Sequence, residues 1–192
     1  MSPARRRLAA ALCCAALFGG CSVLPARAPS AGKPAPDRFD IDGRIAIRAE
    51  KNAFSASLHW TQDADAYALR LSGPLGQGTV EISGDAGGVT LRSADARMLQ
   101  APDPQTLMQR ELGWSLPVAG LRWWVRGLPD PQAAVDDLQI DAAGHTRMLE
   151  QSGWRIELSD YATSGNYLVP VRLVLTSARA TLRLAVRRWT IP

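Results

Sequence analysis

Cys21 is the residue whose chemistry is easiest to name, because it directly follows a segment built like a secretion signal. That segment begins with three arginines at positions 5–7, continues through an apolar stretch over residues 8–18, and ends in two glycines at 19–20. The apolar stretch is shorter than the roughly 20 residues that a membrane-spanning helix needs. The pattern predicts an exported protein that is cut just before Cys21, whose thiol could then carry a lipid.

The run from Leu17 to Cys21 resembles a bacterial lipobox. In that motif the cysteine thiol is acylated, the signal is cut before the cysteine, and the new amino group is acylated too. Phe18 departs from the motif, which prefers a smaller aliphatic residue at this place. Two alternatives stay open, an ordinary signal peptide that is cut nearby and an anchor that is not cut.

Cleavage before Cys21 would change the charge balance of the chain. Removing residues 1–20 from 192 leaves 172, and it takes three of the 22 basic residues, so that 19 basic residues stand against 18 acidic ones. A chain so near neutrality lacks the clustered positive charge that favours nucleic acid, and we expect no such partner. Cys13 and Cys14 leave with the leader, so the domain must be held together by burial alone.

The predicted domain organisation has three parts. Residues 1–20 are a lipoprotein signal peptide, and residues 21–37 are a lipid-anchored flexible tether, in which four prolines interrupt a stretch rich in Ala, Gly and Ser. Residues 38–192 form a single domain, because their number suits one sizeable core rather than two.

After the tether, apolar residues recur at every second position, which is typical of half-buried strands. This alternation appears near residues 39–47, 54–60, 67–71, 80–82, 89–91, 154–158, 169–175 and 182–186. The parity changes between Val186 and Trp189, which predicts a bulge or a change of face.

Two short helices are predicted between the strand sets. Asp103 can cap a helix that begins at Pro104 and ends before Gly113, and a second helix should begin near Pro117 and stop before Gly127. A meander of strands interrupted by a helical pair predicts an α+β fold, and a sheet this long curls toward an open, unclosed antiparallel β-barrel with the helices inside.

In such a fold the alternate residues that face inward have large apolar side chains. These side chains either fill a solid core or line a lipid-sized cavity, and parity alone does not separate the two. The cavity candidates selected by parity and helix spacing are Phe54, Leu58, Trp60, Tyr67, Leu69, Leu71, Leu121 and Trp124.

The sequence carries no recognisable catalytic or metal-binding motif. His59 and His145 stand far apart, and no thiolate remains in the processed chain, so a zinc site is not expected. No serine lies in a nucleophile elbow and no glycine loop matches a phosphate cradle. We expect no enzyme, no cofactor and no metal; the alternative is a catalytic pair assembled from distant acids.

One loop carries an apolar residue where polar residues are usual. Leu75 lies between Pro74 and Gly76 in the segment 73–78, which separates two predicted strands. Its side chain either projects outward or tucks beneath its own turn.

Short motifs occur along the predicted domain in a characteristic order. They are Gly43-Arg44-Ile45-Ala46, then Trp60, then Tyr67, Leu69 and Leu71, then Pro74-Leu75-Gly76, and later Leu116-Pro117, Leu121-Arg122, Trp124 and Gly127-Leu128-Pro129. This order resembles the LolB family of outer-membrane lipoprotein receptors, and it covers nearly all of the predicted domain. The resemblance implies an unclosed antiparallel barrel whose concave apolar face is covered by short helices.

The resemblance also implies an activity. Family members accept triacylated lipoproteins from the soluble periplasmic carrier LolA and release their acyl chains into the phospholipid of the outer membrane. Carried over by position, Cys21 would be the anchored residue, and Pro74, Leu75 and Gly76 the protruding loop that presses into the membrane. Ser22, beside the anchor, favours sorting to the outer membrane. We expect a monomer on the periplasmic face of the outer membrane.

Two other interpretations stay open. The first is a structural outer-membrane lipoprotein with a solid core, which takes up no lipid and contacts an assembly partner through the loop. The second is a soluble periplasmic carrier of the same fold, which would carry no lipid on Cys21.

Overall fold

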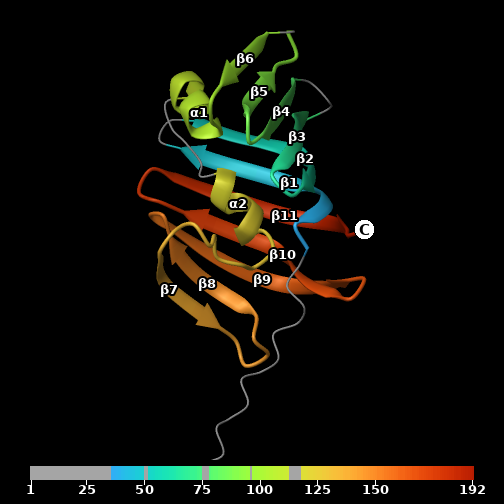
Figure 1. The fold of residues 1–192 in the computed structure, drawn as a ribbon, viewed down its shortest axis with the longest axis vertical. Coiled ribbons are helices and arrows are strands. Elements are labelled where there is room, and N and C mark those ends of the chain that lie inside the picture. The colour runs from blue at the N-terminus through green and yellow to red at the C-terminus, as the bar shows by residue number, and fades with distance from the viewer. Residues whose placement is uncertain (1–35, 50–51, 75–77, 96, 113–117) are drawn as a thin grey trace, which may run out of the picture.

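The computed structural model describes residues 36–49, 52–74, 78–95, 97–112 and 118–192. Within them it forms one antiparallel sheet of eleven strands and two short helices (Figure 1). The strands are β1 (Arg38–Ala49), β2 (Asn52–Asp63), β3 (Ala66–Ser72), β4 (Thr79–Asp85), β5 (Gly88–Arg92), β6 (Met98–Ala101), β7 (Val135–Ile140), β8 (Thr146–Gln151), β9 (Trp154–Ser164), β10 (Tyr167–Thr176) and β11 (Ala180–Thr190). The helices are α1 (Pro104–Leu112) and α2 (Val118–Trp124).

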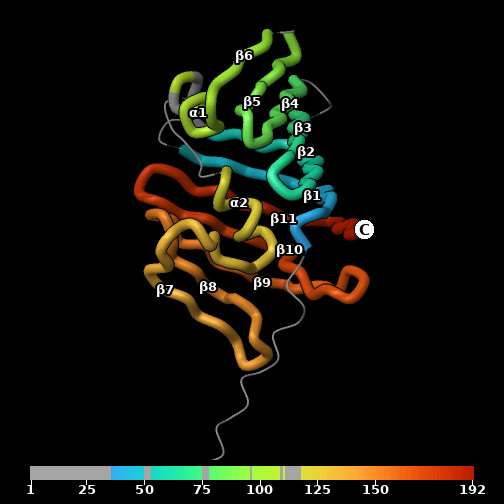
Figure 2. The backbone as a smooth tube through the Cα atoms, viewed as in Figure 1, coloured from blue at the N-terminus to red at the C-terminus, as the bar shows by residue number. Residues whose placement is uncertain are grey.

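The sheet is open, as predicted. Its strand order is β6-β5-β4-β3-β2-β1-β11-β10-β9-β8-β7, so the two edge strands β6 and β7 follow each other in the chain without pairing. The segment between them must pass from one edge of the sheet to the other, and it carries both helices across the concave face (Figure 1). Figure 2 shows the two halves of the chain meeting where blue β1 lies beside red β11.

Side chains alternate between the two faces of the sheet, as the period-two pattern predicts. In β1, Phe39, Ile41 and Ile45 are buried toward α2, while Arg44 and Arg48 are exposed on the other face, which we call the outer face. The buried core beneath α2 joins β1, β2, β8, β9, β10 and β11. Burial of such side chains stabilises the fold by about 1.5–3 kcal/mol each.

The predicted change of parity in the last strand is a β-bulge. Asp42 of β1 pairs with Arg188 and Gly43 pairs with Val186, which leaves one extra residue in β11. Gly43 suits this crowded place, because a Cβ added there would lie 2.5 Å from the carbonyl oxygen of Ala185. Only glycine lets the two backbones approach this closely.

Both helices follow the predicted signals. The N–H of Thr106 donates to Oδ1 of Asp103 at 2.8 Å, which caps α1 and lowers the pKa of Asp103. After α2, Gly127 takes a positive φ of 76°, and its N–H donates to the carbonyl oxygen of Trp124 at 2.9 Å. Gly113 and Pro117, which the sequence placed at the helix ends, lie outside the described residues.

Three strands were not predicted. β6 is only four residues long, and β7 carries two adjacent aspartates in a strand that is exposed throughout. β8 buries Met148 and Leu149 in succession, which breaks the period of two. In the part of the chain that the structure describes, no helix is both long and apolar enough to cross a membrane.

Candidate functional site

The concave face continues past the buried core as a row of directly paired apolar side chains. Trp60 pairs with Leu69, Leu69 with Ile82, Ile82 with Leu91, and Leu91 with Leu99, from β2 across to β6. Directly paired residues share a face of the sheet. Trp60 is 1% exposed, whereas the other four are only half-buried. The apolar face therefore extends beyond the part that is fully covered.

A second row runs parallel to the first. Leu58 of β2 pairs with Leu71 of β3, which pairs with Val80 of β4. Leu58 is buried, while Leu71 and Val80 are half-buried. We call the half-buried members of the two rows the open apolar surface, which consists of Leu69, Leu71, Val80, Ile82, Leu91 and Leu99.

The predicted cavity residues all lie on the concave side, but in different environments. Leu58, Trp60, Leu121 and Trp124 are buried in the core beneath and within α2. Leu69 and Leu71 belong to the open apolar surface and pack against that core. In this structure the first four fill space, and only the last two present apolar area to solvent.

Phe54 and Tyr67, the other two cavity candidates, lie nearer the rim. Phe54 is 42% exposed, on the parity of Leu58. The hydroxyl of half-buried Tyr67 is shielded from solvent and has no hydrogen-bond partner among the described residues. Burial raises the pKa of Tyr67 to about 12, and the carboxylates of Asp103 and Asp85 add to this.

The loop after Ser72 lies at the same end of the sheet as Phe54. Ser57 pairs with Ser72, so the first residues of β2 lie beyond that pair, beside the end of β3. Pro74 is exposed there. Leu75, Gly76 and Cys21 lie outside the described residues, so their predicted roles in membrane insertion and lipidation stay predictions.

A buried glutamine fixes α2 over the concave face. The indole N–H of Trp124 donates to Oε1 of Gln151 at 2.8 Å, and the N–H of Asp130 donates to the same oxygen at 2.9 Å. The amide nitrogen of Gln151 donates to the carbonyl oxygens of Asp130 and Ala133, each at 2.9 Å. All polar atoms of this amide are thus paired inside the protein.

The other side of α2 is fastened to the turn between β2 and β3. Arg122 forms an ion pair with Asp65 and donates to the carbonyl oxygen of Ala64 at 3.2 Å. The guanidinium of Arg126 lies 4.4 Å from the ring centre of Trp123, a cation–π geometry, and burial lowers the pKa of Arg126. The C-terminal end of the helix is therefore held on two sides.

The two buried glutamines, Gln62 and Gln151, were not identified from the sequence. Gln62 is one of the alternate residues of β2 that face inward, where a buried amide needs hydrogen-bond partners. Its side-chain oxygen accepts from Trp60 Nε1 at 3.0 Å, and its nitrogen donates to the carbonyl oxygen of Ala64 at 2.7 Å. That polar residue at an apolar parity position was a usable signal. Gln151 gave none, because β8 breaks the alternation.

Each of the two described histidines lies beside a carboxylate. His59 lies 2.9 Å from Asp42, and His145 lies 3.0 Å from Asp141. Within the described ranges, no group of three or more His, Cys, Asp or Glu side chains gathers closely enough to hold a metal ion.

Two solved structures have a similar fold. A LolA superfamily protein from Nitrosomonas europaea aligns with a TM-score of 0.55 over 81% of this chain and 86% of its own, at 7% identity. A putative outer membrane lipoprotein-sorting protein domain from Vibrio parahaemolyticus gives a TM-score of 0.51 over 80% and 84%, at 4% identity. At such identities the likeness concerns the fold alone.

The sequence comparisons are closer. Residues 37–189 match the family described as "Outer membrane lipoprotein LolB". A protein of Pseudomonas fluorescens called outer-membrane lipoprotein LolB is 37% identical over 187 residues, which are 91% of each chain. A protein of the same name from Pseudomonas paraeruginosa is 41% identical over 153 residues, 80% of this chain and 74% of its own. This chain therefore belongs to the LolB family of outer-membrane lipoproteins.

Proposed function

We propose that this protein is an outer-membrane receptor that takes triacylated lipoproteins from a soluble carrier of the LolA type and delivers their acyl chains to the membrane. The observation that carries the proposal is the open apolar surface, which is directed to the concave side yet only half-buried. Membership of the LolB family supports a role in lipoprotein localisation.

The physical requirement is shelter for acyl chains. Each methylene moved from an apolar environment into water costs about 0.8 kcal/mol, so a lipoprotein crosses an aqueous space only if its chains stay covered. The row that begins at Trp60 continues the core without a polar break as far as Leu99, which makes a continuous apolar path along the sheet. Acyl chains laid on Leu69, Ile82 and Leu91 would complete their burial.

Transfer of the acyl chains requires no chemical energy supplied by this protein. A receptor that holds acyl chains more tightly than the carrier, but less tightly than the bilayer, passes them on by differential affinity. We assign the anchor to Cys21, a flexible tether to residues 21–37, and the last step to the loop of Pro74, Leu75 and Gly76, which would press into the leaflet. A monomer suffices for this sequence of events, and it involves no catalysis.

The experiment is a direct handover. A chain that starts at residue 21 and carries Cys21→Ser keeps every described strand and helix, because β1 begins at Arg38. It is mixed with a purified LolA-type carrier that is loaded with a triacylated lipoprotein, and the two proteins are separated by size and charge. We expect the cargo to elute with the receptor; cargo that stays on the carrier contradicts the proposal.

A structural lipoprotein with a solid core is the second candidate. The full burial of Leu58, Trp60, Leu121 and Trp124 favours it. It predicts no cargo uptake in the handover experiment, and it predicts that anchored protein is recovered from membranes together with an assembly partner.

A further inference from the structure

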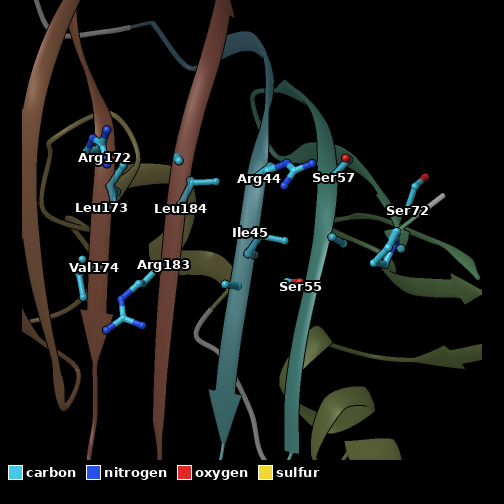
Figure 3. A pocket seen from close by; sticks show the side chains of 15 residues that line it. Arg44, Ile45, Ser55, Ser57, Ser72, Arg172, Leu173, Val174, Arg183 and Leu184 are labelled. Carbon is cyan, nitrogen blue, oxygen red and sulfur yellow. The ribbon is translucent and has the colours of Figure 1, made fainter. Parts of the chain in front are cut away.

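The outer face of the sheet, opposite α2, contains a trough of about 670 Å³ beside the end of β3 (Figure 3). We call it the outer-face trough. Its lining comes from β1, β2, β10, β11 and the segment Ser72–Pro74. Among the described residues that line it, three are arginines and none is a carboxylate. The proposed acyl-chain path lies on the other face, so this trough needs its own explanation.

Strand register explains both the hollow and its charge. One transverse row runs Arg172, Ala185, Arg44, Ser57 and Ser72, from β10 to the end of β3. The small side chains of Ala185, Ser57 and Ser72 leave the floor of the trough low, while the two arginines of the row rise from it. Arg172 and Arg44 stand two strands apart, which corresponds to about 10 Å between their backbones.

The neighbouring row repeats this arrangement. It runs Val174, Arg183, Ala46 and Ser55, again with small residues beside the arginine. Figure 3 shows Arg183 reaching toward Val174 on one side of the trough and Arg44 toward Ser57 on the other. The positive charges are therefore spread across the trough rather than gathered around one point.

Two of these arginines are unpaired within the described part of the chain. Arg44 and Arg183 are exposed, and neither forms an ion pair or a side-chain hydrogen bond with a described residue. The third, Arg172, contacts Asp160 at 2.5 Å and is partly neutralised. Exposed guanidinium groups without carboxylates are suited to bidentate binding of phosphate.

The spacing and position of the charges select the partner. Arg44 and Arg183 are directed to opposite sides of the trough, toward Ser57 and Val174, so they do not converge on one small anion, whereas they match a surface on which phosphates recur. The trough also ends at Ser72, Gly73 and Pro74, the start of the loop to which membrane insertion is assigned. An acidic protein would match the charge equally well, but it would compete with lipid for the same end of the sheet.

We propose that the outer-face trough is a docking surface for the anionic headgroups of a phospholipid bilayer. Arg44 and Arg183 bind lipid phosphates, and this holds the Pro74 end of the sheet against the leaflet. The proposal rests on the proposed function in one respect, namely that the loop after Ser72 meets the membrane. The outer face then docks to lipid while the concave face holds the cargo.

The test is flotation of the cargo-free, Cys21→Ser chain from residue 21 with two kinds of vesicle. One kind is phosphatidylcholine alone, and the other contains about 25 mol % phosphatidylglycerol in phosphatidylethanolamine, which supplies anionic phosphate. The variant is Arg44→Gln with Arg183→Gln. The matched control is Arg92→Gln with Arg147→Gln, which removes two exposed arginines from β5 and β8, outside the trough.

We expect the parent chain to float with the anionic vesicles and not with the neutral ones. Each arginine near an anionic surface contributes about fivefold in partitioning, so the trough variant should bind about 30-fold more weakly. The control pair should change binding less than about threefold, because charges beyond the screening length of about 8 Å contribute little. Circular dichroism confirms that both variants are folded.

Three results overturn the proposal. The first is equal flotation of the trough variant and the parent, and the second is no preference of the parent for anionic vesicles. The third is a trough variant that still floats but no longer associates with the carrier, which would assign the trough to an acidic protein. Because no cargo is present, failure here leaves cargo handover untouched, while failure of handover with normal flotation would reject only the proposed function.

Discussion

Trp124 in α2 and Gln151 at the end of β8 are joined by a 2.8 Å hydrogen bond from the indole nitrogen to the amide oxygen. Gln151 is fully buried, and Trp124 is 1% exposed. In the described part of the chain, α2 is the only helix over the central strands. This bond ties it to β8, which lies next to the edge strand β7. The position of α2, and with it the extent of the covered core, therefore depends in part on one neutral amide.

Replacing Gln151 by leucine should destabilise the fold strongly. It would leave the N–H groups of Trp124 and Asp130 and the carbonyls of Asp130 and Ala133 without their partners. An unpaired buried polar group costs about 1–3 kcal/mol, so we expect roughly 3 kcal/mol or more in the free energy of unfolding. Urea denaturation followed by tryptophan fluorescence measures it. Gln139→Leu, on exposed β7, is the control, and an equal cost for both variants would contradict the role of Gln151.

Tyr67 should make the fold sensitive to alkali. Its pKa is raised to about 12, so the folded state favours the neutral phenol, and the stability that this contributes is complete below the ordinary value of 10.0. That contribution is lost as the pH rises from 10.0 toward about 12. Burial raises the pKa of Tyr161 further still, so phenolate absorbance should show two late-ionising tyrosines in the parent chain.

Tyr67→Phe should remove one of the two late ionisations, together with the alkaline loss of stability that belongs to it, and leave that of Tyr161. Because the hydroxyl has no partner among the described residues, the variant should be as stable as the parent at neutral pH, or more so. Tyr167→Phe, at the start of β10, is the matched control and should leave both late components in place. If both late components survived in Tyr67→Phe, the raised pKa would not belong to Tyr67.

Ile82→Ser should weaken cargo acceptance with little effect on folding. Ile82 lies in the middle of the open apolar surface, between Leu69 and Leu91, and its side chain is already half-exposed. Loss of this contact with acyl chains should lower the equilibrium transfer from carrier to receptor roughly tenfold. Ile140→Ser provides the comparison, since that isoleucine is 59% exposed at the edge strand β7. Unaltered transfer in Ile82→Ser would move the acyl-chain site elsewhere.

Leu75→Glu should separate acceptance from delivery. The charge would oppose insertion of the loop into the leaflet, while the apolar rows on the concave face stay intact, so cargo should still leave the carrier. Delivery to liposomes should fall roughly tenfold or more. Leu138→Glu carries the same change at an exposed leucine of β7 and should deliver normally. Normal delivery by Leu75→Glu would remove the loop from the last step.

The sequence predicted the open sheet and the two helices for identifiable reasons. Alternation in β1, β2, β9 and β11 depends on one face being buried, and that signal is local. Asp103 and Pro104 marked the start of α1 in the same local way. The bulge opposite Gly43 appeared as a change of parity before Trp189. Such features are encoded by residues that are close together in the chain.

The division of the concave face could not be predicted in this way. Trp60 and Leu69 share the same alternation, yet one is buried and the other half-exposed, because α2 covers the first and leaves the second open. Where a helix lies over a sheet depends on contacts between distant segments, such as Trp124 with Gln151 and Arg122 with Asp65. The arginine trough likewise exists only once β10, β11 and β1 are paired.

The pairing of β1 with β11 also governs when the protein can fold. These strands lie at the centre of the sheet, but Ala49 must find Ala180 and Asp40 must find Thr190, across most of the chain. Contacts so distant in sequence form slowly, and here the central pair cannot form at all until the last strand has been synthesised. The sheet consequently stays incomplete while the polypeptide emerges from the ribosome, because β1 gains its second neighbour only with β11.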